Sequence, residues 1–406
     1  MPKRNPEELV FAPLGGVGEI GMNMALYGLG PKNDRRWLIV DCGVTFGGPN
    51  LPGIDLILPD IRFLEAQTKR IDGLVLTHSH EDHYGALLDL WPELGCPVFA
   101  SRFAKSMLEA KARSNGFTEN VPVTIVEPGK RFQAGEFELE LIEMAHSIPE
   151  SFGLLISTPA GNVLHTGDWK LDPNPVGSAP TDIERLERIG RDSHPLAVIG
   201  DSTNATRDGE SPSEADVAKT IDELIAKAPN RVAVTIFASN VGRMITIAKA
   251  AQKAGRKVVA SGMAVHRISR IARDLGMLEG IDEFLDQDSF RHLPRDKVVL
   301  ICTGSQGEPR AAVARIARQE HPAIELARDD MVIFSSRTIP GNEREVTDIQ
   351  NLLIDQGVTL VTDRDALVHV SGHPRRGELR RLYALTKPDI LVPAHGEALH
   401  LKKHAE

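Results

Sequence analysis

The sequence predicts a mixed α/β protein in which a domain of alternating strands and helices interrupts a β-rich domain. Up to about residue 206, short apolar runs are separated by turn residues, a pattern typical of short strands. From residue 207 to about 362, apolar runs alternate with helical patterns, which indicates a parallel sheet of βαβ units. After residue 363 the first pattern returns. We therefore expect an outer domain from residues 1–206 and 363–406 and an inserted domain over residues 207–362.

The apolar runs give the expected elements in chain order. In the first stretch they predict strands over residues 37–40, 74–77, 123–126 and 154–157. In the inserted stretch they predict strands over residues 232–237, 257–260, 298–302 and 332–335, with helices ending near residues 254, 275 and 318. In the closing stretch they predict a strand over 366–370, a helix around 378–386 and a last strand over 390–394.

The segment His78-Ser79-His80-Glu81-Asp82-His83 carries the densest chemical signal. It follows an apolar run that ends at Leu76, so we expect a loop whose side chains converge on one point, with a helix starting at Gly85. Imidazole nitrogen and carboxylate oxygen are ligands that Zn²⁺ accepts, and a cluster without cysteine is unlike a closed structural site. A solvated turn is the alternative, but three histidines and an aspartate at one strand end favour an open metal site with a bound water.

Three further candidate ligands follow apolar runs elsewhere in the chain. His146 follows residues 137–144, Asp168 follows residues 161–167, and His395 follows the run that ends at Ala394. Taken singly, each could be a cap or an ordinary turn residue. Because one loop cannot supply ligands for two metals, we interpret them together with the first loop as a dinuclear set.

In this order, the motifs resemble those of the metallo-β-lactamase superfamily, and Asp41 matches the first motif of that superfamily. Two segments are similar to the motifs that open and close the β-CASP insertion of its nucleic-acid-processing members: Gly200-Asp201-Ser202-Thr203 and Val368-His369-Val370-Ser371-Gly372-His373. Three more segments resemble the ribonuclease J family: Cys302–Pro309, Ile339–Glu343 and Pro393–Glu397. The similarity runs over nearly the whole sequence.

The resemblance implies an α/β fold made of a metallo-β-lactamase αββα sandwich with an inserted parallel α/β β-CASP domain. Family members continue into a C-terminal domain that supports dimerisation, and we expect this domain to be absent from a sequence that stops at Glu406. The family forms homo-oligomers, but without that domain the oligomeric state stays open.

The resemblance also implies two bound divalent metal ions, with Zn²⁺ expected and Mn²⁺ as the alternative. One metal would be held by His78, His80 and His146, and the other by Asp82, His83 and His395, while Asp168 would bridge them. Two cations lower the pKa of a shared water and stabilise charge on phosphoryl oxygens, so Asp82 and Asp168 count among the catalytic residues.

Other residues receive supporting roles from the same resemblance. Asp41 and Asp201 would each orient a ligating imidazole, although Asp41 could equally be a turn residue at a strand end. His373 is similar to the histidine that contacts the scissile phosphate and acts as a general acid for the leaving oxygen. RNA or phosphate contacts are expected from loops that follow strands and from the motif that closes the insertion. The loops contribute Ser239, Asn240, Gly304 and Ser305, and the motif contributes His369, Ser371, Gly372 and His373.

The implied function is a ribonuclease that acts on single-stranded RNA in RNA maturation and decay, with an RNA-degradation complex as a candidate partner. It would combine 5′-to-3′ exonuclease activity on 5′-monophosphate ends with endonuclease activity. Three alternatives are another β-CASP nuclease that acts on DNA or processes tRNA, a small-molecule metallo-hydrolase of the superfamily, and a non-enzymatic RNA-binding partner. A small-molecule hydrolase would lack the inserted domain and the His373 motif. A non-enzymatic RNA-binding partner would have lost metal-ligating residues, and all seven are present here.

Composition favours a cytoplasmic globular protein that does not enter membranes. The sequence is 41% hydrophobic and 25% charged, and no stretch is long enough to span a bilayer. Three widely separated cysteines, Cys42, Cys96 and Cys302, indicate a reducing compartment. The net charge of −9 gives no overall basic footprint for RNA, so any such footprint must be local.

Overall fold

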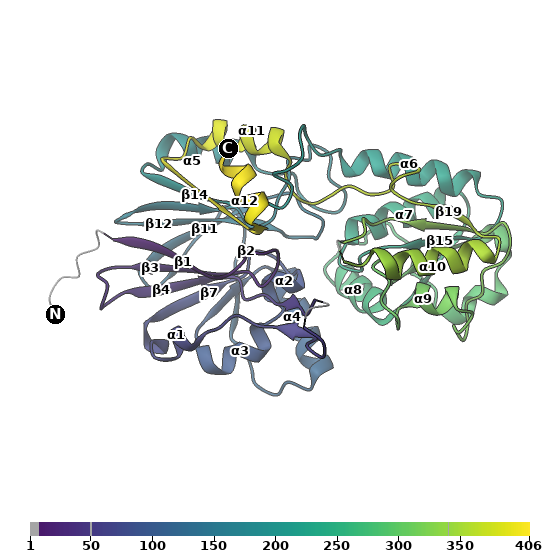
Figure 1. Cartoon of the computed structure of the whole chain (residues 1–406), viewed down its shortest axis with the longest axis horizontal. Helices are drawn as coiled ribbons and strands as arrows, with labels where there is room; N and C mark the ends of the chain where they lie inside the picture. The colour runs from purple at the N-terminus through teal and green to yellow at the C-terminus, as the bar shows by residue number, and fades with distance from the viewer. Residues whose placement is uncertain (1–7, 49–50, 340) are drawn as a thin grey trace. The chain divides into compact units, whose positions relative to one another are not determined.

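The computed structural model describes residues 8–48, 51–339 and 341–406, which form two compact units (Figure 1). The sandwich unit comprises Met1–Pro173, Ala179–Ser211 and Gly372–Glu406, and the insert unit comprises Asn174–Ser178 and Pro212–Ser371. The main segment of the insert unit thus runs from Pro212 to Ser371, where the sequence predicts bounds at residues 207 and 362. Pro340 of the expected 339–343 motif and the basic start at residues 1–7 lie outside the described residues.

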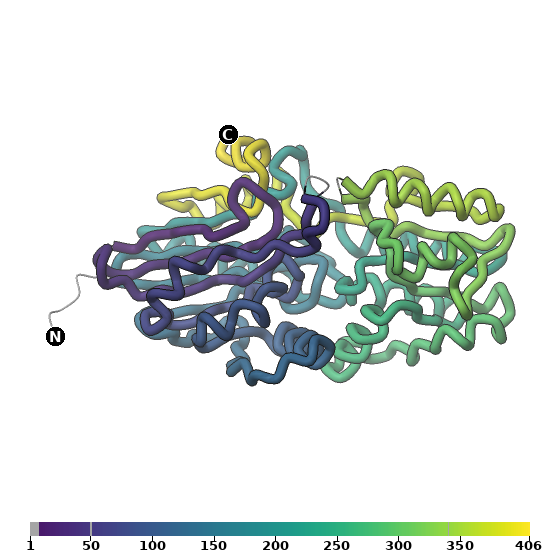
Figure 2. The backbone as a smooth tube through the Cα atoms, turned by 60° about the horizontal axis from the view of Figure 1, so that its bottom comes forward, coloured from purple at the N-terminus to yellow at the C-terminus, as the bar shows by residue number. Residues whose placement is uncertain are grey.

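The sandwich unit is built on two mixed sheets. The first has the strand order β1-β3-β4-β7-β8-β9, from β1 (Leu9–Gly15), β3 (Met24–Leu29), β4 (Arg36–Val40), β7 (Ile71–Val75), β8 (Val98–Ala100) and β9 (Val123–Ile125). The second has the order β10-β11-β12-β13-β14-β20, from β10 (Arg131–Ala134), β11 (Phe137–Glu143), β12 (Phe152–Thr158), β13 (Gly161–His165), β14 (Leu196–Asp201) and β20 (Ile390–Ala394). Figure 2 shows the yellow C-terminal segment returning to this unit, where β20 pairs in parallel with β14.

Apolar layers cover both faces of the second sheet. Between the sheets, alternate side chains such as Leu38, Val75, Leu139 and Ile156 meet in one buried cluster. The outer face of the second sheet packs against α5 (Ile183–Asp192) and α11 (Arg376–Thr386), which lie above it in Figure 1. The remaining elements of this unit are β2 (Val17–Gly18), β5 (Thr45–Phe46), β6 (Leu56–Ile57), α1 (Arg62–Glu65), η1 (Thr68–Arg70), α2 (Glu81–Tyr84), α3 (Leu87–Leu94), α4 (Arg102–Asn115), β21 (Gly396–Glu397) and α12 (Ala398–Ala405).

The insert unit is a parallel sheet with helices on both faces, as the alternating pattern predicts. Its strand order is β16-β17-β15-β18-β19, from β15 (Val232–Thr235), β16 (Lys257–Ser261), β17 (Val298–Cys302), β18 (Met331–Phe334) and β19 (Thr359–Val361). The helical elements are α6 (Glu214–Lys227), α7 (Val241–Lys253), α8 (Met263–Asp274), η2 (Gln287–His292), η3 (Arg295–Lys297), α9 (Ala312–Ala317) and α10 (Glu343–Asp355). In Figure 1, α6 and α7 lie on one side of this sheet, and α9 and α10 lie on the other.

Two local predictions are wrong. The segment 78–83 is only partly a loop, because Glu81–Tyr84 form the one-turn helix α2 after His80. Residues 366–370 form no strand, although Val368 and Val370 are buried as the alternation predicts. Side chains take the place of a neighbouring strand there, since the Val368 carbonyl accepts hydrogen bonds from Arg243 and Ser335 of the same unit.

A half-buried carboxyl at the end of β11 should make stability depend on pH. Burial first, and then the charges of Glu150 and Asp182, raise the pKa of Glu143 from 4.5 to about 7. The native state therefore holds a proton that the unfolded chain releases near pH 4.5, so stability falls as the pH rises from about 4.5 through about 7.

We expect Glu143→Gln to raise the free energy of unfolding at pH 8 by about 1–2 kcal/mol. This is less than the full pKa shift of Glu143 would give, because solvent screens the charge of a half-buried group. At pH 4.5 the variant should match the parent protein. The measurement is chemical denaturation followed by tryptophan fluorescence, because Trp37, Trp91 and Trp169 all lie in the sandwich unit. Glu119→Gln on the exposed surface is the control, and an equal gain at both pH values would contradict the prediction.

Across the described residues, no helix combines the length and apolar character needed to cross a bilayer.

Candidate metal centre

The candidate site lies in the sandwich unit, at the carboxyl ends of its strands. The segment that begins at His78 follows β7, His146 follows β11, and Asp168 follows β13. In the second sheet, β13, β14 and β20 are parallel neighbours, so Asp168, Asp201 and His395 reach the same edge. Parallel strands collect their following loops at one edge, which is why polar residues far apart in the sequence meet here.

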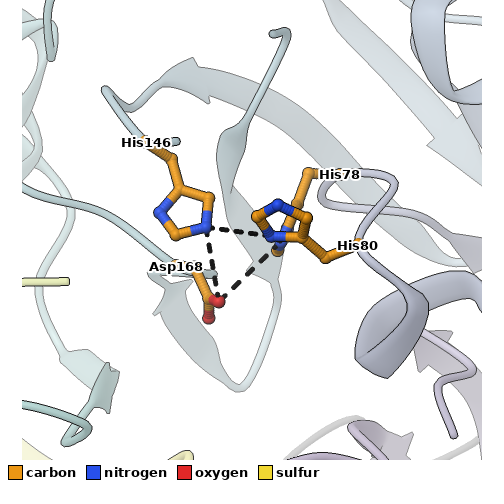
Figure 3. A group of neighbouring side chains, drawn as sticks. All are labelled: His78, His80, His146 and Asp168. Carbon is orange, nitrogen blue, oxygen red and sulfur yellow. Dashed lines mark hydrogen bonds and ion pairs between the residues drawn. The ribbon is translucent and has the colours of Figure 1, made fainter. Parts of the chain in front are cut away.

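One group of ligand atoms is formed by His78, His80, His146 and Asp168 (Figure 3). The Nδ1 atom of His80 lies 3.1 Å from His78 Nε2 and 3.1 Å from His146 Nε2. A carboxylate oxygen of Asp168, Oδ2, lies 3.8 Å from His78 Nε2 and 3.7 Å from His146 Nε2. Three imidazole nitrogens and one carboxylate oxygen thus face a common point.

The outer nitrogens of two imidazoles are held by acceptors. His146 Nδ1 lies 2.7 Å from the Gly372 carbonyl, which can only accept, so Nδ1 carries the proton. The Thr77 hydroxyl donates to Asp41 over 2.8 Å, so its oxygen accepts from His78 Nδ1 at 3.0 Å. Both Nε2 atoms therefore present lone pairs to the centre. Burial holds the pKa of His78 and of His146 well below the usual range. Burial also lowers the pKa of His80 to about 4. All three imidazoles are therefore neutral, as metal ligands must be.

A second group is formed by Asp82, His83, Asp168 and His395. Asp168 Oδ2 lies 3.3 Å from His83 Nε2 and 3.6 Å from His395 Nε2. Asp82 Oδ2 lies 3.6 Å from His83 Nε2 and 3.8 Å from His395 Nε2. The two groups share Asp168, which is the arrangement expected of a bridging carboxylate.

Asp168 is the electrostatic centre of the site. Burial alone would raise the pKa of this carboxyl, but His395, His83 and His373 hold it well below its usual range. Its second oxygen, Oδ1, is buried and has no hydrogen-bond partner among the described residues. A buried carboxylate oxygen that lacks a partner is costly unless a cation or water satisfies it. The donor set and this oxygen fit two divalent cations.

Asp41 supports the centre from the end of β4. Its backbone φ is 64°, in the left-handed region that Asp tolerates better than most residues. Its carboxylate accepts from the Thr77 amide at 2.7 Å and from His83 Nδ1 at 2.7 Å. The second contact directs His83 Nε2 toward Asp168, as expected of a residue that orients a ligand.

His373 and Asp201 form a third group of potential ligands with Asp168 and His395. His373 Nδ1 donates to Asp201 over 2.8 Å and lies 3.8 Å from Asp168 Oδ2. Burial lowers the pKa of His373, but the carboxylates of Asp201 and Asp168 outweigh it and raise the pKa to about 9. These two carboxylates therefore favour the protonated form of the His373 imidazole.

The residues expected to contact RNA lie in both units. In the insert unit, Ser239 and Asn240 precede α7, and Asn240 caps that helix by accepting from the Arg243 amide at 2.8 Å. Gly304 and Ser305 follow β17, and Ser305 is buried.

The closing motif divides between the units, because His369 and Ser371 belong to the insert unit while Gly372 and His373 belong to the sandwich unit. The Gly372 carbonyl accepts from His146, and the same residue has no room for a side chain, since a Cβ there would lie 2.6 Å from His146 Nδ1.

Thr77 and Asn23 contact candidate ligands but were not predicted from the sequence. Thr77 links Asp41 to His78, and Asn23, just before β3, contacts Asp82, His83 and His395. Neither carries a charge or an imidazole. Their positions in the sequence were the only indication of a role at the site. Thr77 directly precedes the histidine segment, and Asn23 follows the glycines at 15, 16, 18 and 21.

Three family models match the chain. The model described as metallo-beta-lactamase superfamily matches residues 23–238, and the one described as ribonuclease J, beta-CASP domain matches residues 229–353. The model described as Zn-dependent metallo-hydrolase RNA specificity domain matches residues 357–406. These matches confirm the predicted fold class, a metallo-β-lactamase domain with a β-CASP domain.

Curated relatives named ribonuclease J align with nearly the whole chain. The protein of Sinorhizobium meliloti is 54% identical over 98% of this chain and 71% of its own length. The proteins of Corynebacterium glutamicum and Mycolicibacterium smegmatis are 42% and 43% identical over 100% of this chain, and over 56% and 72% of their own lengths. A crystal structure of a protein of unknown function from Enterococcus faecalis has a similar fold, with a TM-score of 0.67 at 17% identity over 98% of this chain and 96% of that one.

Proposed function

The chain belongs to the ribonuclease J family of the metallo-β-lactamase superfamily, and from that premise we propose that it is a metal-dependent ribonuclease. The observation that carries the proposal is the pair of ligand groups that share the buried Asp168. Hydrolysis of a phosphodiester needs an activated water and a way to neutralise charge on the phosphoryl oxygens. A protein with two adjacent cation sites is suited to both tasks.

In this proposal the two cations are Zn²⁺, with Mn²⁺ as the alternative. One cation would be held by His78, His80 and His146, and the other by Asp82, His83 and His395. Asp168 would bind both cations. When bound, the cations would lower the pKa of a water and offset negative charge on the scissile phosphate. Neutral imidazoles and carboxylates suit either metal, and the choice depends on geometry and supply.

The side chains around the cations would orient ligands and move one proton. Asp41 holds His83 so that Nε2 faces the centre, and the Gly372 carbonyl does the same for His146. His373, held by Asp201, would donate a proton to the bridging oxygen that leaves as the P–O bond breaks. The proton that the attacking water loses would pass to the carboxylates around it, for which Asp82 and Asp168 are the candidates.

We further propose a 5′-to-3′ exonuclease activity that prefers 5′-monophosphate ends, together with endonuclease activity, on single-stranded RNA. The support is the family membership and the match of residues 357–406 to an RNA specificity domain. Binding of the RNA backbone would involve eight polar and glycine residues: Ser239, Asn240, Gly304, Ser305, His369, Ser371, Gly372 and His373. A cytoplasmic location fits this role, and it fits the three cysteines, which are all buried and free.

The test is degradation of end-labelled single-stranded RNA that carries a 5′-monophosphate, a 5′-triphosphate or a 5′-hydroxyl. We expect fastest release of mononucleotides from the monophosphate, some internal cleavage of all three, and little action on matched DNA. His80→Ala, which lacks one ligand, is the inactive control. Equal internal cleavage of the three RNAs would leave only the endonuclease, and a preference for DNA would contradict the RNA assignment.

A further inference from the structure

The side-chain amide of Asn23 contacts three of the four residues in the second ligand group. Its Nδ2 lies 3.0 Å from the Asp82 carbonyl oxygen, 3.5 Å from an Asp82 carboxylate oxygen and 3.1 Å from His83 Nε2. Its Oδ1 lies 2.9 Å from His395 Nδ1. Asn23 therefore joins ligands that are separated from it by as many as 372 positions in the sequence.

The contacts determine which way the amide faces. A backbone carbonyl can only accept a hydrogen bond, so the end of the amide beside the Asp82 carbonyl must be the NH₂ group. The other end, an oxygen, can only accept, so His395 Nδ1 must carry the proton. His395 Nε2 is then left with its lone pair directed to Asp82 and Asp168, which is the tautomer that a cation requires.

Among the described residues, Asn23 Oδ1 is the hydrogen-bond partner of His395 Nδ1, just as Asp41 is the partner of His83 Nδ1. The backbone of His395 also needs support, since its φ is 48°, in the left-handed region. Its amide donates to the Gly16 carbonyl over 2.6 Å. The ligand at the end of β20 is thus held by the segment that precedes β3.

The fold holds Asn23 itself tightly. The backbone N–H of Asn23 donates to the Asp82 carbonyl over 2.9 Å, and the backbone carbonyl of Asn23 accepts from the Gly43 N–H over 2.9 Å. A Cβ on Gly16 would lie 2.2 Å from Asn23 Oδ1, so the glycine leaves the space that the amide occupies. A side chain fixed at both backbone groups and fitted against a glycine loses little entropy when it orients a ligand.

We propose that Asn23 is a positioning residue of the second cation site, where it sets the tautomer of His395 and ties the loop of Asp82 to it. The inference rests on the proposed two-cation centre and adds a residue to it. The first group has its own supports at Thr77 and Gly372, so loss of the Asn23 amide should weaken one cation and leave the other.

The experiment is a calorimetric titration of the metal-depleted full chain with Zn²⁺ and, separately, Mn²⁺. Wild-type protein should bind two cations. Asn23→Ala should bind the first with unchanged affinity and the second about 10–100-fold more weakly, the range for residues that orient a metal ligand. Asn23→Asp keeps an acceptor for His395 Nδ1 and should retain more of the second affinity than the alanine variant. Asn162→Ala is the control, since the side chain of Asn162 donates to the Ser193 carbonyl over 2.9 Å, away from the site.

Two readouts separate positioning from a general structural role. Imidazole nitrogen NMR should show the Nδ1-protonated tautomer for His395 in wild-type protein and a mixture in Asn23→Ala, while circular dichroism and thermal unfolding show that the variant is folded. Equal affinity of wild type and Asn23→Ala for both cations would overturn the inference, and so would loss of both cations from a folded variant. A wild-type protein that binds fewer than two cations would instead contradict the centre on which the inference rests.

Discussion

Replacement of Asp168 by asparagine is expected to abolish binding of both cations and to lower kcat/KM on RNA by more than about 10²-fold. Loss of a residue that only orients a ligand costs about 10–100-fold, and Asp168 is proposed to bind both cations directly. Its Oδ2 lies 3.3 Å from His83 Nε2, 3.6 Å from His395 Nε2 and 3.7 Å from His146 Nε2. Asparagine keeps the shape of the side chain but removes the negative charge that would balance the two cations.

The measurement combines elemental analysis of bound metal after dialysis with initial rates on labelled RNA. Asp182→Asn is the matched control, because Asp182 caps α5 by accepting from the Arg185 amide at 2.9 Å and asparagine caps a helix equally well. That variant should keep two cations and full activity. An Asp168→Asn protein that retains one tightly bound cation would show that the carboxylate serves a single site and does not bridge.

The candidate ligands of this site could be predicted from the sequence because each follows a short apolar run with the pattern of a strand. His146, Asp168 and His395 lie at strand ends in the structure as the pattern predicts, and parallel pairing brings the last two to one edge. The chemistry of the residue type and the period of the strand therefore pointed to the same positions.

What could not be predicted depends on contacts between distant segments. Asn23 is an uncharged residue in a glycine-rich segment, and its role appears only when β3 and β20 place it beside His395. The missing strand at 366–370 has the same origin. The sequence showed alternation, and Val368 and Val370 are indeed buried, but the Val368 carbonyl accepts from Arg243 and Ser335 rather than from a neighbouring strand. Periodicity predicts which face is buried and does not identify the partner of the backbone.

His373→Ala is expected to lower kcat by about 10²–10⁴-fold, the usual contribution of a general acid, while both cations stay bound. The imidazole is held by Asp201 at 2.8 Å, which also favours the protonated form that can donate. If its task is to protonate the leaving oxygen, the need for it disappears when that oxygen is a better leaving group. An RNA with sulfur in place of the leaving bridging oxygen supplies this test, because a thiolate departs without a proton.

We therefore expect the ratio of wild-type to His373→Ala rates to be large on ordinary RNA and to approach one on the sulfur-containing RNA, with the same cation present in both assays. A defect of equal size on both substrates would exclude the general-acid role. The third ligand group, in which His373 and Asp201 join Asp168 and His395, raises a specific competing explanation. In that case His373 would bind a cation, and the alanine variant would contain less metal than the wild type. The metal content of the variant therefore decides whether the histidine supplies a proton to the leaving group or a nitrogen to the centre.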